Sequence, residues 1–515
     1  MRIERTKNAT RNIAFGIAQK VYQTVLPFIM RTAIIYYMGV QYLGLNSLFA
    51  SILQVLNLAE LGVSSAMVFS MYKPIADDDK GRICALMGLY KMYYRYIGLI
   101  IAVVGIVITP IVPKLIQGEL PNGVNIYVLY LLNLSATVLT YWLFAYKNAL
   151  LQAHQRTDVV SKITLLVDTF KFLAQIIVLR LFKNYYLYVI VVLLSQALSN
   201  VITAFFASKM YPEYVAKGRL DDIEVKEINR RIRDLFTSKV GAVIVNSADA
   251  IVISAFLGLT MLAIYQNYFF ILTAVLSFVT VVFNSCTAGI GNSLITETCE
   301  KNFNDFKKFT FIISWIAGVC SCCFLNLYQP FMEIWVGKNL LLEFSAVICF
   351  CVYYYVYEIN QLLNTYKDAG GIWHKDRFRP LVTALFNLTL NIVMVQFWGI
   401  YGVLLSTVLS MLLIGMPWIL VNLFSTLFER KSLKEYLKKV MLYAIVSFFS
   451  CCLTYFLCNQ IRMGAWTTLI IKQIICLLVP NIVFYVIYRN LQEFKDSLIL
   501  INKMTKGMLK RRMMR

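Results

Sequence analysis

The feature that most constrains this sequence is a series of apolar blocks, each about 20 residues long, that recurs along its length. One example is Val124–Phe144, bounded by Pro121 and Lys147. About 20 helical residues span the hydrocarbon core of a bilayer, because each adds about 1.5 Å. Membrane-spanning β-strands would instead read as short segments of alternating polarity, and the sequence contains none. We therefore predict an all-α integral membrane protein.

The composition agrees with this class. Of the 515 residues, 59% are hydrophobic and only 15% are charged, whereas soluble proteins have close to a quarter charged residues. The apolar blocks predict about 14 transmembrane helices. They lie near residues 12–38, 43–71, 92–112, 124–146, 159–180, 185–207, 238–257, 261–289, 308–328, 340–364, 381–398, 401–425, 438–458 and 466–488.

The net charge of +22 is distributed unevenly between the two sides of the predicted helices. If the N-terminus is cytoplasmic, 40 of the 49 Lys and Arg residues lie in or next to cytoplasmic segments. This is the positive-inside pattern, and it places both termini in the cytoplasm, which requires an even number of helices. We expect the basic face to meet anionic membrane lipids and not nucleic acid.

The longest polar interruption, Lys209–Lys239, separates six predicted helices from eight. A weak internal repeat accompanies it: MGVQYLGLNSLF from Met38 resembles LGLTMLAIYQNYFF from Leu257, with Gly39 aligned to Gly258. Repeat-built lobes are usual in alternating-access transporters. We predict an N-terminal six-helix lobe, a cytoplasmic connecting segment, a C-terminal six-helix lobe, and two additional helices with a basic tail. Their ranges are 1–208, 209–237, 238–428 and 429–515.

Charges inside predicted helices identify candidate binding residues, since each costs about 2.5–3.5 kcal/mol on insertion scales unless it is paired, hydrated or used. Lys20 and Arg31 in the first helix are eleven residues apart and therefore face the same way. Gln23 lies near this face, and Pro27 between the two cations predicts a kink. The alternative is that both cations reach out to the membrane interfaces.

Two acidic residues also lie within predicted helices of the first half of the chain. Asp168, Lys171 and Gln175 share one face of the fifth helix, where the two charges either neutralise each other or line a cavity. Glu60 is a possible partner for a cation of the first helix, or lies in water near the cytoplasmic end. Cations concentrated in this half of the chain would favour an anionic substrate group such as a phosphate.

The second half offers oxygen ligands instead. Asp249 follows Asn246 by about one turn, and Asn387 and Asn391 are spaced i, i+4. Carboxylate and amide oxygens suit a desolvated Na⁺, and a lone carboxylate suits a proton. The alternative for the asparagines is hydrogen bonding between helices. Apart from Na⁺ or H⁺ as a coupling ion, we expect no cofactor and no other metal.

Nothing in the sequence resembles an enzyme site. His154 and His374 are the only histidines, they lie in predicted loops, and no Walker loop is present. Most of the twelve cysteines fall inside predicted helices, so we interpret Cys320 and Cys323 (C-x-x-C) as packing thiols. Lys472, in the last predicted helix, either contacts a lipid phosphate or pairs with a residue of another helix.

Two stretches resemble a known family. RTAIIYYMGVQYLGLNSLFASILQVLNLAELGVSSAMVFSMYKPIADDD, from Arg31 to Asp79, resembles the bacterial polysaccharide flippases of the O-antigen (Wzx) type. DAIVISAFLGLTMLAIYQNYFFIL, from Asp249, resembles part of their second lobe. These flippases belong to the multidrug/oligosaccharidyl-lipid/polysaccharide exporter superfamily.

The resemblance implies two six-helix lobes, a V-shaped central cavity and alternating access. Its implied substrate is an oligosaccharide repeat unit linked through pyrophosphate to undecaprenol, moved between leaflets of the bacterial cytoplasmic (inner) membrane. Lys20 and Arg31 would then hold the pyrophosphate, while Asp249, Asn387 and Asn391 would lie near a cation site. The last two helices would form a groove for the lipid tail. Other polysaccharide assembly proteins are implied partners.

Three alternative functions would each require different features in the sequence. A drug or cation exporter of the same superfamily commonly has twelve helices and would favour acidic cavity residues. A polysaccharide polymerase or membrane glycosyltransferase needs a large polar loop with catalytic residues, but the longest loop here has about thirty residues. A scaffold that transports nothing would not need two cations on one helix face.

Overall fold

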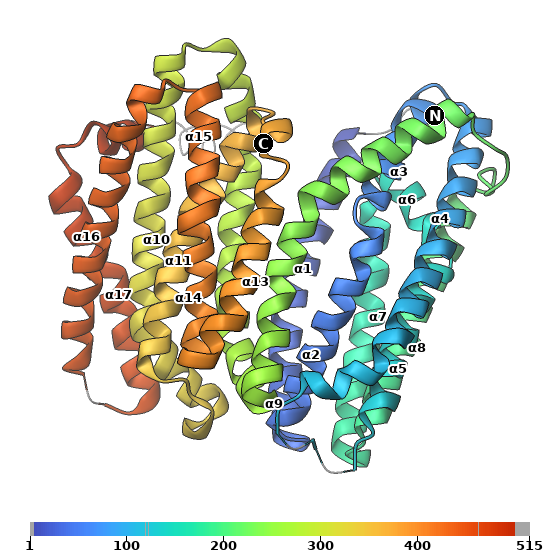
Figure 1. Cartoon of the computed structure of the whole chain (residues 1–515), viewed down its shortest axis with the longest axis horizontal. Helices are drawn as coiled ribbons and strands as arrows, with labels where there is room; N and C mark the ends of the chain where they lie inside the picture. The colour runs from blue at the N-terminus through green and yellow to red at the C-terminus, as the bar shows by residue number, and fades with distance from the viewer. Residues whose placement is uncertain (1–4, 119, 122, 462, 500–515) are drawn as a thin grey trace. The chain divides into compact units, whose positions relative to one another are not determined.

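In the computed structural model the described residues are 5–118, 120–121, 123–461 and 463–499. Within them every regular element is helical, which confirms the predicted class (Figure 1). The chain divides into two compact units, Met1–Gln266 and Asn267–Arg515. This boundary falls inside α9, later than the predicted connecting segment 209–237, and the predicted lobe boundaries remain a prediction.

Unit 1 contains eight helices and the first part of a ninth. They are α1 (Arg5–Tyr37), α2 (Val40–Leu56), α3 (Val63–Ala76), α4 (Lys80–Ile108), α5 (Ile126–Trp142), α6 (Tyr146–Ala153), α7 (Thr157–Ile177), α8 (Tyr185–Met210) and α9 (Asp222–Thr296). Unit 2 contains the rest of α9 and the helices that follow. These are α10 (Cys299–Val336), α11 (Phe344–Ala369), α12 (Trp373–Asp376), α13 (Arg379–Trp398), α14 (Ile400–Ser410), α15 (Met416–Thr426), α16 (Leu433–Asn459) and α17 (Ala465–Tyr488).

Each of the fourteen predicted ranges is largely helical, although several are interrupted. The second range is divided into α2 and α3 by a 3₁₀ turn, and the twelfth into α14 and α15 by a π-helical turn. Ten described helices are long and apolar enough to cross a membrane, or eleven if the bent pair α5 and α6 is one span. This number is smaller than the fourteen predicted spans for two reasons. Helices α1 and α7 contain charged residues that lower their mean hydropathy. Helix α9 is counted once, although it contains two predicted spans.

A glycine turn separates those two spans of α9. Gly258 has φ 85° and ψ 174°, and a Cβ atom there would lie 2.8 Å from the carbonyl oxygen of Gln117. Gly39, its predicted repeat equivalent, precedes α2 with φ 111° and ψ 162°. Only glycine adopts this conformation readily. Two junctions at corresponding places in the sequence therefore share one backbone geometry, as a duplicated segment would.

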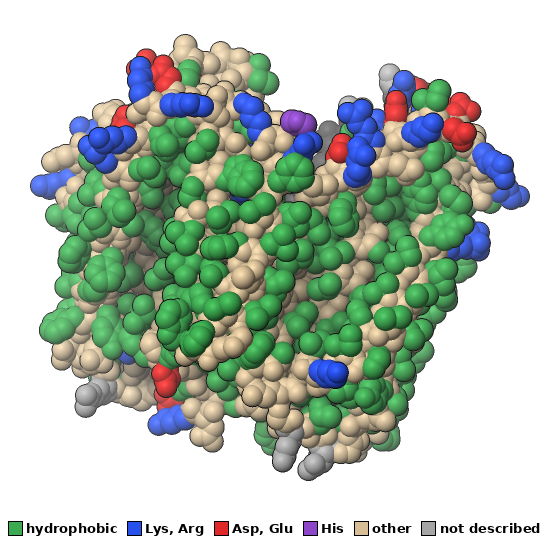
Figure 2. Space-filling model, viewed as in Figure 1, with side chains coloured by type: hydrophobic (Ala, Val, Ile, Leu, Met, Phe, Trp, Pro, Cys, Tyr) green, Lys and Arg blue, Asp and Glu red, His purple; other side chains and the backbone are tan. Residues whose placement is uncertain are grey.

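Basic residues gather at one end of the helices in each unit (Figure 2). In unit 1, Lys80 pairs with Glu213 at 2.5 Å, and this hydrogen bond raises the pKa of the lysine. In unit 2, Lys307 pairs with Glu435 at 2.8 Å, joining the start of α10 to the start of α16. A basic end of this kind is what the positive-inside pattern predicts.

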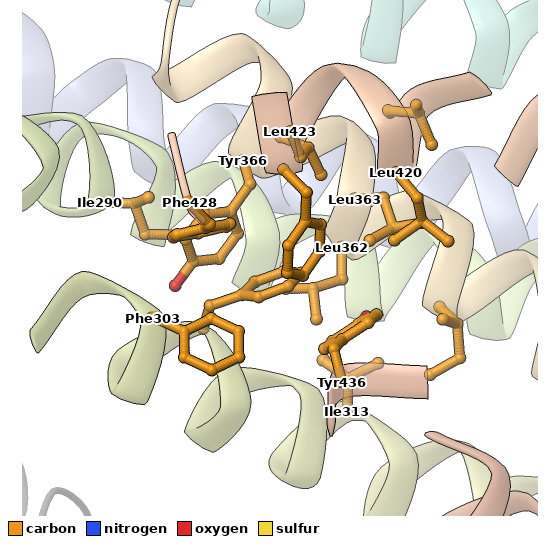
Figure 3. Close-up of a cluster of buried hydrophobic side chains, with 14 of the residues drawn as sticks. Ile290, Phe303, Ile313, Leu362, Leu363, Tyr366, Leu420, Leu423, Phe428 and Tyr436 are labelled. Carbon is orange, nitrogen blue, oxygen red and sulfur yellow. The ribbon is translucent and has the colours of Figure 1, made fainter. Parts of the chain in front are cut away.

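Unit 2 is held together by an aromatic cluster that joins α10, α11, α15 and α16 (Figure 3). Phe306 of α10 is fully buried and lies 4.6 Å from Tyr366, 5.0 Å from Phe428 and 4.7 Å from Tyr436, measured between ring centroids. Lipid tails are as apolar as these side chains, so close packing, not exclusion from water, is the main gain. The cluster therefore anchors α16 on the rest of unit 2.

The cysteines contribute to the same packing. All twelve are free thiols. Cys322 of α10 lies 3.3 Å from Cys451 of α16, and Cys458 of α16 lies 4.0 Å from Cys476 of α17, measured between sulfur atoms. These contacts place cysteines where α10, α16 and α17 meet, which agrees with packing thiols.

Phe306→Ala should remove four ring contacts, with Tyr366, Phe424, Phe428 and Tyr436, and destabilise unit 2 by about 3–5 kcal/mol. We expect a clearly lower melting temperature for the detergent-purified protein. Phe397→Ala is the matched control, because Phe397 is 77% exposed at the end of α13. Equal melting temperatures for the two variants would contradict the anchoring role of the cluster.

Candidate functional site

Helix α1 has two distinct exposed faces. Its large exposed apolar side chains form one stripe, consisting of Val21, Val25, Ile29 and Tyr36. Lys20, Gln23 and Arg31 lie about 150° around the helix from the centre of this stripe, at about 100° per residue. Pro27 lies inside α1 without ending it, so the relation holds along the helix. The polar face is therefore not the face best suited to contact lipid.

Lys20 is exposed on this polar face. In the described part of the chain its side chain has neither an ion pair nor a hydrogen bond, so no acidic residue neutralises it there. A lysine two turns or more inside a membrane helix needs water or an anion to remain charged. Lys20 thus has the properties of a residue that meets a solvated or anionic group.

Arg31 is half-buried and interacts with aromatic residues. Its electrostatic neighbour is Tyr188 of α8, and Gln175 of α7 lies close to the hydroxyl group of the same tyrosine. Tyr188 stacks on Tyr185 with ring centroids 5.6 Å apart, and Tyr185 lies 5.0 Å from Tyr42 of α2. Four helices therefore contribute to the surroundings of Arg31. These tyrosines could not be predicted from sequence patterns, because they are distant from Arg31 along the chain.

Asp168 and Lys171 form the local pair that the sequence left open. The lysine nitrogen lies 2.5 Å from the carboxylate, and it also lies 4.3 Å from the centre of the Phe172 ring. The side chains of Lys171 and Asp168 are only 20% and 19% exposed, respectively. The charge of Lys171 is therefore neutralised within α7, which leaves Lys20 and Arg31 as the two cations of the candidate site.

Glu60 lies in the 3₁₀ turn Asn57–Glu60 between α2 and α3. It accepts a hydrogen bond from Tyr94 of α4 at 3.1 Å, and Tyr94 in turn accepts one from Tyr90 at 2.6 Å. Tyr141 of α5 donates to Asn57 of the same turn at 3.1 Å. The structure thus surrounds Glu60 with tyrosines and not with a cation of α1, which was one of the two possibilities from sequence.

The predicted cation ligand Asp249 is buried in α9. It accepts a hydrogen bond from Tyr265 at 3.3 Å, across the turn at Gly258. The side chain of Asn246 lies outside the described residues. A carboxylate is a group that can take up a proton or bind a small cation through its oxygens.

Asn387 and Asn391 of α13 are fully buried and connect α13 to α14. Asn387 donates to Thr407 at 3.1 Å, Asn391 donates to Asn387 at 3.4 Å, and Ser406 donates to Asn391. The bonds to Thr407 and Ser406 are hydrogen bonds between helices, which the sequence left as an alternative. Asp249 belongs to unit 1 and both asparagines to unit 2. Within the described residues, no group of three or more His, Cys, Asp and Glu side chains is suited to a metal ion.

Solved structures with the same arrangement of helices exist. One is the lipid II flippase MurJ in an inward-closed conformation, with a TM-score of 0.65 and 17% identity over 93% of this chain and 99% of MurJ. Another is a multidrug resistance MATE family transporter of the MOP superfamily, inward-facing, with a TM-score of 0.59 and 16% identity over 81% of this chain and 96% of the transporter. A mutant of the Vibrio cholerae MATE transporter VcmN has a TM-score of 0.53 and 12% identity, over 82% of this chain and 97% of VcmN.

The chain has the fold of these flippases and transporters. No protein-family model matches the sequence, and no curated protein matches it, so the likeness is one of structure. The first of these three proteins is a flippase and the other two are transporters. The comparison therefore shows the fold that the resemblance implied.

A double-mutant cycle tests the ion pair in α7. Asp168→Asn and Lys171→Gln alone each leave one charge without its partner in a membrane helix, so each should lower the melting temperature. The double variant should recover most of the loss, with a coupling free energy of about 1 kcal/mol or more. Additive losses would show that the two side chains do not interact.

Proposed function

We propose that this protein is a flippase that moves undecaprenyl-pyrophosphate-linked oligosaccharide repeat units from the cytoplasmic to the outer leaflet by alternating access. The observation that carries the proposal is the polar face of α1. Lys20, Gln23 and Arg31 lie together on it, away from the exposed apolar stripe. Two cations in one membrane helix carry a combined insertion cost of several kcal/mol, which an anionic substrate offsets.

The two cations suit different stages of pyrophosphate transfer. They are about 16 Å apart along α1, at about 1.5 Å per residue. Lys20, nearer the N-terminal end, is exposed and offers a flexible point charge. Arg31 offers a planar guanidinium that binds phosphate oxygens in pairs, and its orientation is supported by the tyrosines around it. We propose that the phosphates meet Lys20 first and Arg31 later, in the direction of transport.

The main alternative is a drug or cation exporter of the same superfamily. The extent of the structural matches favours the flippase, because MurJ covers 93% of this chain while the two MATE structures cover 81% and 82%. The difference is about the size of two membrane helices, such as α16 and α17. The charges on the polar face of α1 favour it too, since Lys20 and Arg31 would repel a cationic drug.

We further propose the bacterial cytoplasmic membrane as the location, with the basic helix ends and both termini in the cytoplasm. The support is the gathering of Lys and Arg at one end of each unit. The partners of the protein would be the lipid-linked oligosaccharide, membrane lipids and other polysaccharide assembly proteins. These assignments follow from the proposed cargo, which must be made on the cytoplasmic side and used outside.

The energy source in this proposal is Na⁺ or H⁺ binding at Asp249, or the membrane potential. Asp249 is buried and hydrogen-bonded to Tyr265, so neutralising its charge would favour a different packing of α9. A potential of 100 mV supplies about 2.3 kcal/mol per elementary charge moved. Either source is sufficient to bias an equilibrium between two conformations.

Removing both charges with Lys20→Gln and Arg31→Gln should reduce surface polysaccharide at least tenfold in cells that depend on this gene. The reason is loss of the anion-binding face, so the protein should still be made and should remain folded. Asp168→Asn with Lys171→Gln is the matched control, since it also removes a membrane lysine but leaves the net charge unchanged. Normal polysaccharide display in the Lys20 and Arg31 double variant would refute the proposed substrate.

Asp249→Asn should remove the dependence of transport on Na⁺ or on pH, because the amide neither takes up a proton nor carries the charge that attracts a cation. Transport by purified protein in liposomes, measured across Na⁺ and pH gradients, gives the comparison. Glu343→Gln, at the N-terminal end of α11, is the control. An ion response equal to that of the wild type would exclude Asp249 as the coupling residue.

A further inference from the structure

Unit 2 contains a polar cavity of about 410 Å³ that the proposed transport mechanism does not use. It is formed where one face each of α10, α16 and α17 converge, with Phe344 at the start of α11. The lining residues on α10 include Asn326, Gln329 and Glu333, which are spaced i, i+3, i+7, and those on α17 include Thr468 and Lys472, spaced i, i+4. The cavity lies at the end of these helices opposite to the Lys307–Glu435 ion pair.

Most polar groups in the cavity wall already have partners. Asn326 donates to the carbonyl oxygen of Cys322 at 2.8 Å. Gln329 donates to the carbonyl of Leu342 at 2.6 Å and accepts from Tyr268 at 2.9 Å. The hydroxyl group of Thr468 donates to the carbonyl oxygen of Met463 at 3.1 Å. These residues form a fixed polar wall.

Lys472 differs from them. It is half-buried, about 10 Å along α17 from the first residue of the helix. In the part of the chain that the structure describes, its ammonium group has neither an ion pair nor a hydrogen bond, and its electrostatic neighbour is the thiol of Cys458. A membrane lysine costs about 2.5–3.5 kcal/mol unless a counter-charge or water meets it. The deep part of the cavity therefore attracts an anion.

The rim of the cavity carries the opposite charge. Glu333 lies three residues before the end of α10, about 10 Å along the helix from Asn326. Its partner Lys338 is 3.4 Å away, and the two side chains are 44% and 79% exposed. An exposed ion pair of this kind contributes at most about 1 kcal/mol, so a ligand can displace it. The same cavity thus has a cation, Lys472, in its deep part and a carboxylate, Glu333, at its rim.

We propose that this cavity binds the head group of a phospholipid with a primary amine, such as phosphatidylethanolamine. The phosphate would lie on Lys472 and the ammonium group on Glu333. This order matches that of a bilayer, in which the phosphate is deeper than the amine. The flexible lysine side chain extends toward the rim and shortens the gap between the two charges. Anionic lipids would be repelled by Glu333, and a choline group has no N–H to donate to it.

The inference goes beyond the proposed function, since the cargo cations Lys20 and Arg31 belong to unit 1. With the proposed orientation, the lipid would come from the outer leaflet. A lipid seated between α10, α16 and α17 would stabilise the attachment of the last two helices, of which the aromatic cluster secures α16 at the other end.

Native mass spectrometry and thermal unfolding of the detergent-purified full chain test the proposal. Phosphatidylethanolamine, phosphatidylcholine and phosphatidylglycerol with identical acyl chains are added one at a time. We expect one phosphatidylethanolamine per chain, bound at least tenfold more tightly than either other lipid, with a matching rise in melting temperature. Equal binding of all three lipids, or preference for phosphatidylglycerol, would overturn the proposal.

Variants locate the site. Lys472→Gln should weaken phosphatidylethanolamine binding at least tenfold, and Glu333→Gln should remove the preference over phosphatidylglycerol while leaving some binding. Lys338→Gln is the matched control at the same end of unit 2, and it should not weaken binding. Unchanged lipid binding in both the Lys472 and Glu333 variants would place the lipid elsewhere. Because no cargo is present, these results do not depend on the proposed flippase activity.

Discussion

The structure depends on one constraint, which is that a charge inside the bilayer must be paired, surrounded by polar groups or put to use. Unit 1 meets this constraint in several ways. Asp168 and Lys171 pair within one turn of α7, and Glu60 accepts a hydrogen bond from Tyr94. Lys20 has no such partner among the described residues and remains exposed. The arrangement thus distinguishes charges that belong to the scaffold from the one most available to a substrate.

The close packing of helices also constrains the sequence, because it requires small residues where two backbones touch. Where helices approach each other without solvent between them, small residues are required. At Gly44 of α2, a Cβ atom would lie 2.1 Å from the carbonyl oxygen of Leu259 in α9, so the two backbones are in direct contact. The glycine turns at Gly39 and Gly258 lie beside this contact in the sequence and share one conformation. This shared geometry gives the weak sequence repeat a physical meaning.

The last two helices have a structural explanation as well. Phe306 and Tyr436 join α10 to α16 at the basic end, and the cysteine contacts continue along the same helices. The polar cavity with Lys472 lies at the far end of the same interface. In the proposed mechanism, in which helices move, this firmly attached pair of additional helices would provide a surface for lipid.

The sequence alone determined the all-α membrane class, all fourteen helical ranges and the basic side, because hydrophobic length and charge distribution are local properties. It also contained the Asp168–Lys171 pair, whose members are three residues apart. Only the tertiary structure decided that Arg31 meets Tyr188 and that Glu60 meets Tyr94, because these partners come from different helices. Pairing between helices depends on how each helix is rotated and packed, and an apolar sequence does not encode this in any short pattern.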